Sequence, residues 1–203
     1  MQDELLIRRA QRGDADAFEQ LLLEHQKNVY NLCYRMAGNP DDAMDLSQET
    51  FLRAWRCLDQ YQFASAFSTW LYRLCSNICI DFLRRRRRQQ TVPLTFEDAD
   101  GEEQTYAVPD VQPLPEEQVE LKLTRETLAA AMAQLLPEHR AVLQLRVVNE
   151  MSYEQIADVL DIQIGTVKSR LSRARNQLKK ILERGNLSRR ASSESMEGEV
   201  AAK

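Results

Sequence analysis

The sequence has no segment long and apolar enough to anchor the chain in a membrane or to direct its secretion. No run approaches the ~18 apolar residues that a membrane-spanning helix requires. The N-terminal residues, MQDELLIRRAQRGDADAF, lack the apolar core of a signal peptide. We therefore expect the protein to be cytoplasmic.

Motifs for catalysis are also missing. The sequence contains no Gly-rich phosphate-binding loop, no nucleophile motif and no internal repeat. We therefore expect a protein that is not an enzyme, with no catalytic residues, no cofactor and no small-molecule substrate.

Cysteine is scarce and forms no C-x-x-C pair. The four cysteines, Cys33, Cys57, Cys75 and Cys79, all fall within helical patterns. Cys75 and Cys79 are one helical turn apart, a spacing that could hold a metal ion or respond to oxidants. Buried, reduced thiols are far more common in such a setting. No metal site is therefore expected, and the role of the cysteines stays open.

The net charge of −4 by itself argues against a nucleic-acid-binding protein. The charges are segregated along the chain, however. Residues 1–88 carry 13 Lys and Arg against 12 Asp and Glu, residues 89–124 carry 1 against 9, and residues 125–203 carry 13 against 10. Two near-neutral or basic units are therefore joined by an acidic connector.

Aromatic residues make up only 7% of the chain, and many of them gather in the stretch 61–88, YQFASAFSTWLYRLCSNICIDFLRRRRR. From Trp70 onward the apolar residues recur at helical spacing, which predicts a loop followed by a helix with one buried face. A second stripe of the same period consists of Trp70, Arg73, Asn77 and Asp81. Aromatic platforms beside a positive track suit single-stranded nucleic acid. A core helix with surface aromatics and a solvated arginine tail explains the pattern equally well.

A helix is predicted to begin at Asn39 and to end near Leu58. A capping Asn is followed by a proline at the first helical position and then by two acidic residues. Asp42, Asp45 and Glu49 share the exposed face of this helix. The acidic face is either simply solvated or docks a basic protein partner.

The remaining helices are predicted over 4–12 and 16–36, with a break near 26–28 left open, and over 116–136, 138–149, 153–160 and about 165–182. Ser152 and Gln155 give the 153–160 helix a capping-box start. The last two helices form a helix-turn-helix. Six Lys and Arg precede the first acidic residue of the last helix, Glu183, and this favours DNA binding over a purely structural helix pair.

Three segments resemble bacterial RNA polymerase sigma factors of the sigma-70 family, in the extracytoplasmic-function (ECF) subgroup. They are DAFEQLLLEHQKNVYNLCYRMAGNPDDAMDLSQETFLRAW, FSTWLYRLCSNICIDFLRRR and LPEHRAVLQLRVVNEMSYEQIADVLDIQIGTVKSRLSRAR. The resemblance implies an all-α fold of two small helical domains joined by a flexible acidic linker. The implied parts are a region 2-like domain (1–88), the linker (89–115), a region 4-like helix-turn-helix domain (116–184) and a disordered tail (185–203).

The resemblance also implies a transcription initiation factor that directs core RNA polymerase to promoters by −35 readout and −10 melting, with capture of a flipped base. The implied contact with the β′ clamp helices of the polymerase consists of Asp45, Gln48, Glu49, Leu52 and Trp55. The implied −10 contacts are Tyr61, Phe63, Phe67, Trp70, Arg73, Asn77, Asp81, Arg84 and Arg85. The implied −35 contacts are Thr166, Lys168, Ser169, Arg170, Arg173 and Arg175.

Further partners follow from the same resemblance. They are promoter DNA, the β flap of the polymerase and an anti-sigma factor, which in this family is often membrane-anchored. The alternative is a stand-alone helix-turn-helix regulator with an N-terminal sensor or dimerisation domain, which leaves the aromatic and arginine stretch unexplained. The promoter sequence, the inducing signal and the role of the tail stay open.

The distance between the promoter elements indicates how the linker must be arranged on DNA. Two promoter elements two helical turns apart are separated by roughly 70 Å. A relaxed coil of the linker's length spans about 30 Å, and the fully extended chain about 90 Å. The linker is therefore expected to be held stretched on a promoter.

Overall fold

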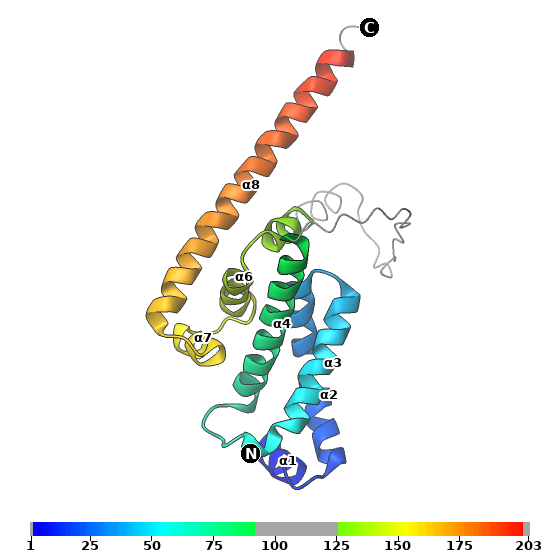
Figure 1. Cartoon of the computed structure of the whole chain (residues 1–203), viewed down its shortest axis with the longest axis vertical. Helices are drawn as coiled ribbons and strands as arrows, with labels where there is room; N and C mark the ends of the chain where they lie inside the picture. The colour runs from blue at the N-terminus through cyan, green and yellow to red at the C-terminus, as the bar shows by residue number, and fades with distance from the viewer. Residues whose placement is uncertain (1, 92–125, 201–203) are drawn as a thin grey trace.

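The computed structural model describes residues 2–91 and 126–200 of the 203-residue chain (Figure 1). All regular structure within these two ranges is helical, so the predicted all-α fold is confirmed. None of the helices in the described ranges combines the length and the apolar character needed to cross a membrane.

The first unit is a bundle of long helices closed at one end by a short one. It consists of α1 (Gln2–Ala10), α2 (Ala15–Ala37), α3 (Pro40–Arg56) and α4 (Phe67–Thr91), and α2, α3 and α4 pack against one another (Figure 1). α2 is continuous through residues 26–28, where the sequence left a break open.

Side-chain caps fix the boundaries of α2 and α3. Asp14 accepts a hydrogen bond from the backbone N–H of Ala17 at 3.1 Å and so begins α2. Gly38, at φ +89°, ends it in the left-handed conformation that glycine adopts without a steric penalty. Asn39 accepts from the N–H of Asp42 at 2.8 Å and caps α3, as predicted.

A 3-10 turn, η1 (Leu58–Gln60), and the loop 61–66 connect α3 to α4. α4 begins at Phe67, and its last turns contain the arginine run 84–88. The helix then continues to Thr91, into the first residues that the sequence assigned to the linker. Arginine favours helix, and the first proline after the run is Pro93, so the sequence offers no earlier stop.

The second unit begins with a helical segment over 126–133. It continues with α6 (Pro137–Leu143), which passes into one π-helical turn, η2 (Gln144–Val148). α7 (Tyr153–Leu160) and α8 (Ile164–Val200) form the predicted helix-turn-helix. The predicted capping box is confirmed, because Ser152 Oγ accepts from the N–H of Gln155 and Gln155 Oε1 accepts from the N–H of Ser152.

α8 is longer than the sequence predicted. The prediction ended this helix near Leu182 and assigned no ordered structure to 185–203, whereas α8 continues to Val200. Residues 186–200 contain no proline, so the helix meets no strong stop signal. The acidic linker from residue 92 onward and the predicted helical residues 116–125 lie outside the described residues.

The two units pack against each other with α4 between them. α2 and α3 contact one side of α4, and α6 and α7 contact the other (Figure 1). Arg140, only 5% exposed, joins the units, because its guanidinium donates to the carbonyl oxygens of Met36 in α2 and of Ala133, both at 2.5 Å. The sequence predicted two units but not this contact between them.

Candidate nucleic-acid and protein interfaces

An apolar groove of about 670 Å³ lies between α2 and α3. On its wall, Leu52 is 51% exposed and Trp55 is 38% exposed. The Trp55 ring packs on Phe18 of α2, with ring centroids 4.9 Å apart. Tyr30, Met44 and Phe51 also line the groove. Exposed aromatic and aliphatic side chains gathered in one hollow are typical of a surface that binds another protein.

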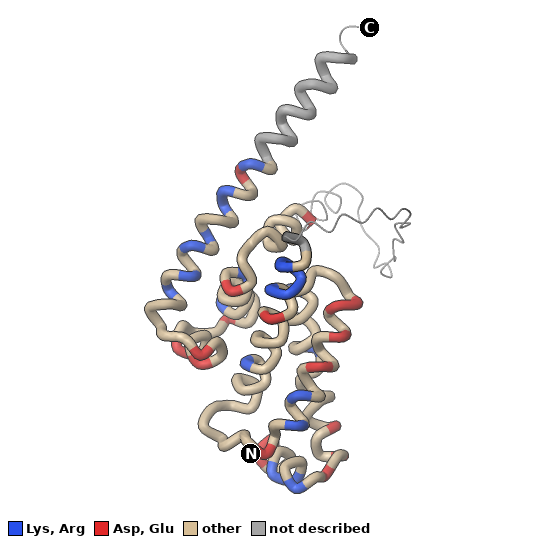
Figure 2. The backbone as a smooth tube through the Cα atoms, in the orientation of Figure 1, with Lys and Arg blue, Asp and Glu red and all other residues tan. Residues whose placement is uncertain are grey.

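Three of the five side chains expected to contact polymerase line this groove, and Glu49 instead lines a hollow between α3 and α4. Gln48, Leu52 and Trp55 line the groove. Asp45 and Glu49 are exposed on the same helix, and Figure 2 shows acidic positions spaced along α3. The acidic face is narrower than the sequence indicated, because Asp42 is half-buried and pairs with Arg86 of α4 at 2.7 Å.

The loop 61–66 and the first turn of α4 form an aromatic cluster around Tyr61. Its ring centroid lies 4.9 Å from that of Phe63, 5.7 Å from that of Phe67 and 5.4 Å from that of Trp70. Tyr61 and Phe67 are only 6% exposed, whereas Phe63 and Trp70 are half-buried. The sequence grouped all four as contacts to DNA, but only Phe63 and Trp70 among them keep partly exposed ring surface.

The Tyr61 hydroxyl closes the loop by donating to the carbonyl oxygen of Ser65 at 2.6 Å. Burial raises the pKa of Tyr61, and the nearby carboxylates of Asp3 and Glu4 raise it further. The hydroxyl therefore stays protonated at neutral pH and remains a donor. The closure gives the loop a defined shape.

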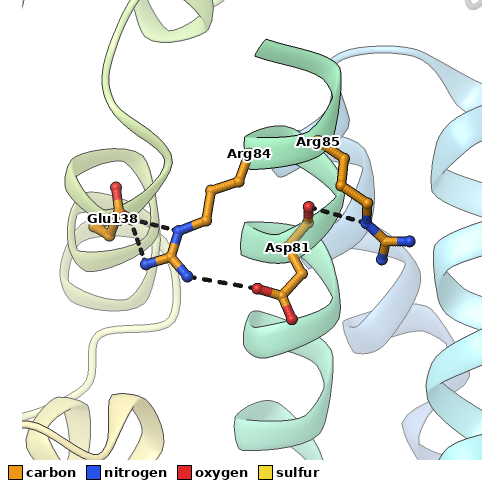
Figure 3. Close-up of polar contacts among 4 residues, drawn as sticks. All are labelled: Asp81, Arg84, Arg85 and Glu138. Carbon is orange, nitrogen blue, oxygen red and sulfur yellow. Dashed lines mark hydrogen bonds and ion pairs between the residues drawn. The ribbon is translucent and has the colours of Figure 1, made fainter. Parts of the chain in front are cut away.

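The polar stripe of α4 faces the second unit. Arg84 pairs with Glu138 of α6 at 2.6 Å and with Asp81 at 3.5 Å, and Arg85 Nε donates to the backbone oxygen of Asp81 at 3.3 Å (Figure 3). Burial raises the pKa of Glu138, but hydrogen bonds from its own backbone and from Arg84 outweigh burial, so the net pKa is lowered. The ion pair therefore holds across the two units at neutral pH.

A hollow of about 400 Å³ separates this stripe from the helix-turn-helix. Asn77, Asp81 and Arg84 line it from α4, and Leu160 and Arg170 line it from the second unit. Polar groups from both units therefore line one hollow that is open to solvent. Arg73, from the same stripe, is half-buried, and its buried Nε has no hydrogen-bond partner within the described part of the chain.

The N-terminal half of α8 presents the cations predicted to contact DNA. Lys168, Arg173 and Arg175 are exposed, and Figure 2 shows basic positions repeated along this helix. Thr166 is half-buried, and its backbone oxygen accepts from the hydroxyl of the exposed Ser169 at 3.0 Å. Arg170 is half-buried and lines the hollow between the units, so four of the six predicted −35 residues are exposed and two, Thr166 and Arg170, are half-buried.

Three of the four cysteines lie together in the core of the first unit. Cys33 Sγ of α2 is 3.4 Å from Cys75 Sγ and 3.8 Å from Cys79 Sγ, both of α4, and none of the three side chains is exposed. Sulfurs this close could hold a thiophilic metal ion. They equally fit reduced thiols packed between two helices.

Sequence reasoning missed several residues that build these surfaces. Arg140 and Glu138 sit in a helical pattern that gives no sign of a contact across units. Phe51 is half-buried and lines the groove, and helical spacing alone does not distinguish such a position from a fully buried one. Phe18 gave no signal, because its partner Trp55 is distant in the sequence.

Comparison with known protein families matches both units. The model of sigma-70 region 2 matches residues 21–89, and the model of sigma-70 region 4 matches residues 125–178. The chain is 33% identical over 176 residues to the ECF RNA polymerase sigma factor SigW of Bacillus subtilis, with 87% of this chain and 94% of SigW covered.

Solved structures share the fold. CnrH in complex with the cytosolic domain of CnrY gives a TM-score of 0.63 at 26% identity, covering 90% of this chain and 98% of the matched chain. The sigma factor RpoE in complex with the anti-sigma factor NepR, from Bartonella quintana, gives a TM-score of 0.57 at 27% identity, covering 82% and 96%.

Proposed function

Because the chain belongs to the ECF group of the sigma-70 family and is a non-enzymatic transcription initiation factor, we propose a separate binding role for each of three surfaces. The groove between α2 and α3 binds core RNA polymerase. The aromatic loop with the stripe of α4 opens the −10 region. The N-terminal half of α8 reads the −35 region. The protein works in the cytoplasm, where polymerase and promoters are.

The groove carries the polymerase part of the proposal. It is a hollow in which large apolar side chains stay open, and α3, which forms one of its walls, also carries the exposed acids Asp45 and Glu49. Apolar anchors such as Leu52 and Trp55 bind a partner helix by burial, and flanking acids select a basic one. The β′ clamp helices are the proposed occupant, and the second unit is proposed to contact the β flap.

The DNA part of the proposal uses two different kinds of surface. Phe63 and Trp70 offer half-buried rings on which an unstacked base can be held. Exposed arginines after position 84 supply charge for the backbone phosphates. On α8, Lys168 and Arg173 project from the half of the helix that enters a major groove in helix-turn-helix proteins.

The two DNA surfaces cannot contact one promoter at the same time while the units are packed together. On a promoter the −10 and −35 regions lie roughly 70 Å apart, whereas here α4 and α7 are in contact. We propose that the units separate when polymerase and promoter bind. An anti-sigma factor, the kind of partner that RpoE has in its complex with NepR, would stabilise the packed state.

In vitro transcription tests this proposal. Core polymerase with the protein should give transcripts from a subset of fragments of host genomic DNA, and the free protein should protect none of those promoters from nuclease. Specific binding to a palindromic site by the free protein, with no transcript in the presence of core polymerase, would instead support the stand-alone regulator. The matches to both sigma regions do not favour that alternative.

A further inference from the structure

The short helix α1 is joined to the aromatic loop by one side chain. Gln11 Nε2 donates to the carbonyl oxygens of Leu58 and of Tyr61, both at 2.9 Å. These oxygens stand at the two ends of the stretch that leads from η1 into the loop 61–66. A side-chain amide nitrogen has two N–H groups, so the two bonds use its full donor capacity.

Gln11 itself is held in place by the end of α1. Its backbone N–H donates to the carbonyl oxygen of Ile7 at 2.8 Å, which continues the last helical turn. Leu6, Ile7 and Ala10 are buried in the core of the first unit. The end of α1 is therefore fixed by packing in the core, and the two hydrogen bonds of the Gln11 side chain constrain the loop relative to the bundle.

A second contact from α1 reaches the same loop. The Arg8 guanidinium lies 4.7 Å from the centroid of the Phe63 ring and also pairs with Glu4 at 2.8 Å. Phe63 has φ +59°, a left-handed conformation that residues with side chains rarely adopt and that persists where the surroundings enforce it. Gln11 fixes the backbone before this residue, and Arg8 lies over one face of its ring.

We propose that Gln11 is a positioning residue for −10 recognition, acting through the loop rather than on DNA. The inference rests on the proposed function, in which Phe63 and Trp70 hold an unstacked base. With Gln11 in place, the backbone at Tyr61 is fixed, and the half-buried rings face the DNA in one arrangement. Without it, the carbonyl oxygens of Leu58 and Tyr61 each lose a hydrogen-bond donor, and the loop samples other arrangements before it meets a base.

Two substitutions separate hydrogen bonding from packing. Gln11→Ala removes the amide, and Gln11→Glu keeps its size but replaces the donor with an oxygen that faces two carbonyl oxygens. Gln20→Ala, an exposed glutamine of α2, is the matched control. The holoenzyme assembled from core polymerase and each variant is tested on a promoter found by in vitro transcription. Strand opening is followed by 2-aminopurine fluorescence in the −10 region.

Both Gln11 variants should slow opening by about tenfold, the size expected for two neutral hydrogen bonds, while affinity for core polymerase stays within twofold. Selectivity should also fall, because the rate ratio between the native −10 sequence and a single-base variant depends on a fixed pocket. Normal opening and selectivity in Gln11→Glu would overturn the inference, since packing alone would then suffice. An equal loss of polymerase affinity would also overturn it, by showing general damage to the unit.

Trp70→Ala distinguishes failure of the inference from failure of the proposed function. If Trp70→Ala slows opening and the Gln11 variants do not, only the role of Gln11 is wrong. If Trp70→Ala leaves opening unchanged, the loop does not act on −10 DNA, and the proposed function of that surface is wrong whatever the Gln11 variants do.

Discussion

The two long faces of the first unit differ in what covers them. The groove between α2 and α3 is open, with Leu52 and Trp55 exposed. The face of α4 that packs against α6 and α7 is partly covered: Arg84 is paired with Glu138 across that contact, whereas Asn77 and Asp81 stay exposed. On the proposed function, the free chain offers its polymerase surface, whereas the contact between the units holds its two DNA surfaces too close together to reach both promoter elements. Polymerase should therefore bind the packed chain, and promoter recognition should require the units to separate.

The contact between the units combines polar and apolar groups. Arg140 reaches across to the first unit through a hydrogen bond to a backbone oxygen, and Arg84 reaches back through an ion pair at the edge. Buried apolar side chains of both units also form one cluster, so separating the units exposes apolar surface that contacts with polymerase or another partner must replace. The open groove is apolar, so its occupant should contribute a large favourable burial term.

Removing the apolar anchor of the open face should have the largest effect. Trp55→Ala is expected to weaken binding to core polymerase by about 2 kcal/mol or more, roughly 30-fold, as for an aromatic hot spot at an interface. Fluorescence anisotropy with labelled protein measures this. Leu23→Ala, an exposed leucine of α2 that does not line the groove, is the control and should leave affinity unchanged. Equal effects of the two substitutions would show that the groove is not the binding surface.

Removing the central polar contact of the covered face should separate the units. Arg140→Met keeps an apolar stem but leaves the carbonyl oxygens of Met36 and Ala133 without their donor, a cost of about 2 kcal/mol. Small-angle scattering should show a larger radius of gyration for the free protein. Arg146→Met removes a bond to the Met151 oxygen within the second unit and should not change the radius. An unchanged radius in Arg140→Met would mean that other contacts hold the units together.

The open face was easier to predict from the sequence than the covered one. Helical periodicity and caps such as Asn39 and Ser152 placed the helices, because these signals are local. Leu52 and Trp55 were predicted as polymerase contacts through the family resemblance; they are exposed and line the groove, and their role stays a prediction. The groove itself was not predicted, since it requires Phe18 of α2 to meet Trp55 of α3.

The covered face depends on contacts that no local pattern encodes. Arg140 and Met36 are 104 positions apart, and Glu138 follows Arg84 by 54. The spacing of an arginine in an amphipathic helix is the same whether its guanidinium lies in solvent or donates to a carbonyl oxygen of another unit. For the same reason Tyr61 and Phe67 were grouped with Phe63 and Trp70, although the first two are packed inside.

Two arginines of α8 test whether the units are packed in the free protein, because one side chain is exposed and the other is half-buried at the contact between the units. Arg173 is exposed, whereas Arg170 faces the hollow beside Asp81. In the free protein, Arg173→Ala should weaken non-specific duplex binding by about 1 kcal/mol, and Arg170→Ala should have little effect. In the holoenzyme both should weaken −35 binding. Equal effects in the free protein, measured by electrophoretic mobility shift at fixed salt, would show that the units are already apart.

The smallest effect expected is a pH dependence of the stability of the contact between α4 and the second unit. Glu138 has a pKa below its ordinary value of about 4.5 when the units are packed. Its carboxylate therefore stabilises the contact fully above pH 4.5, and this contribution is lost as the pH falls through the lowered pKa. Arg84 is 47% exposed, so solvent screening limits the contribution to less than about 1 kcal/mol. Glu138→Gln should abolish this part of the pH dependence of the radius of gyration, whereas Glu154→Gln, on α7, should retain it. If wild type and Glu138→Gln expand at the same pH, the ion pair does not help to hold the α4 face covered.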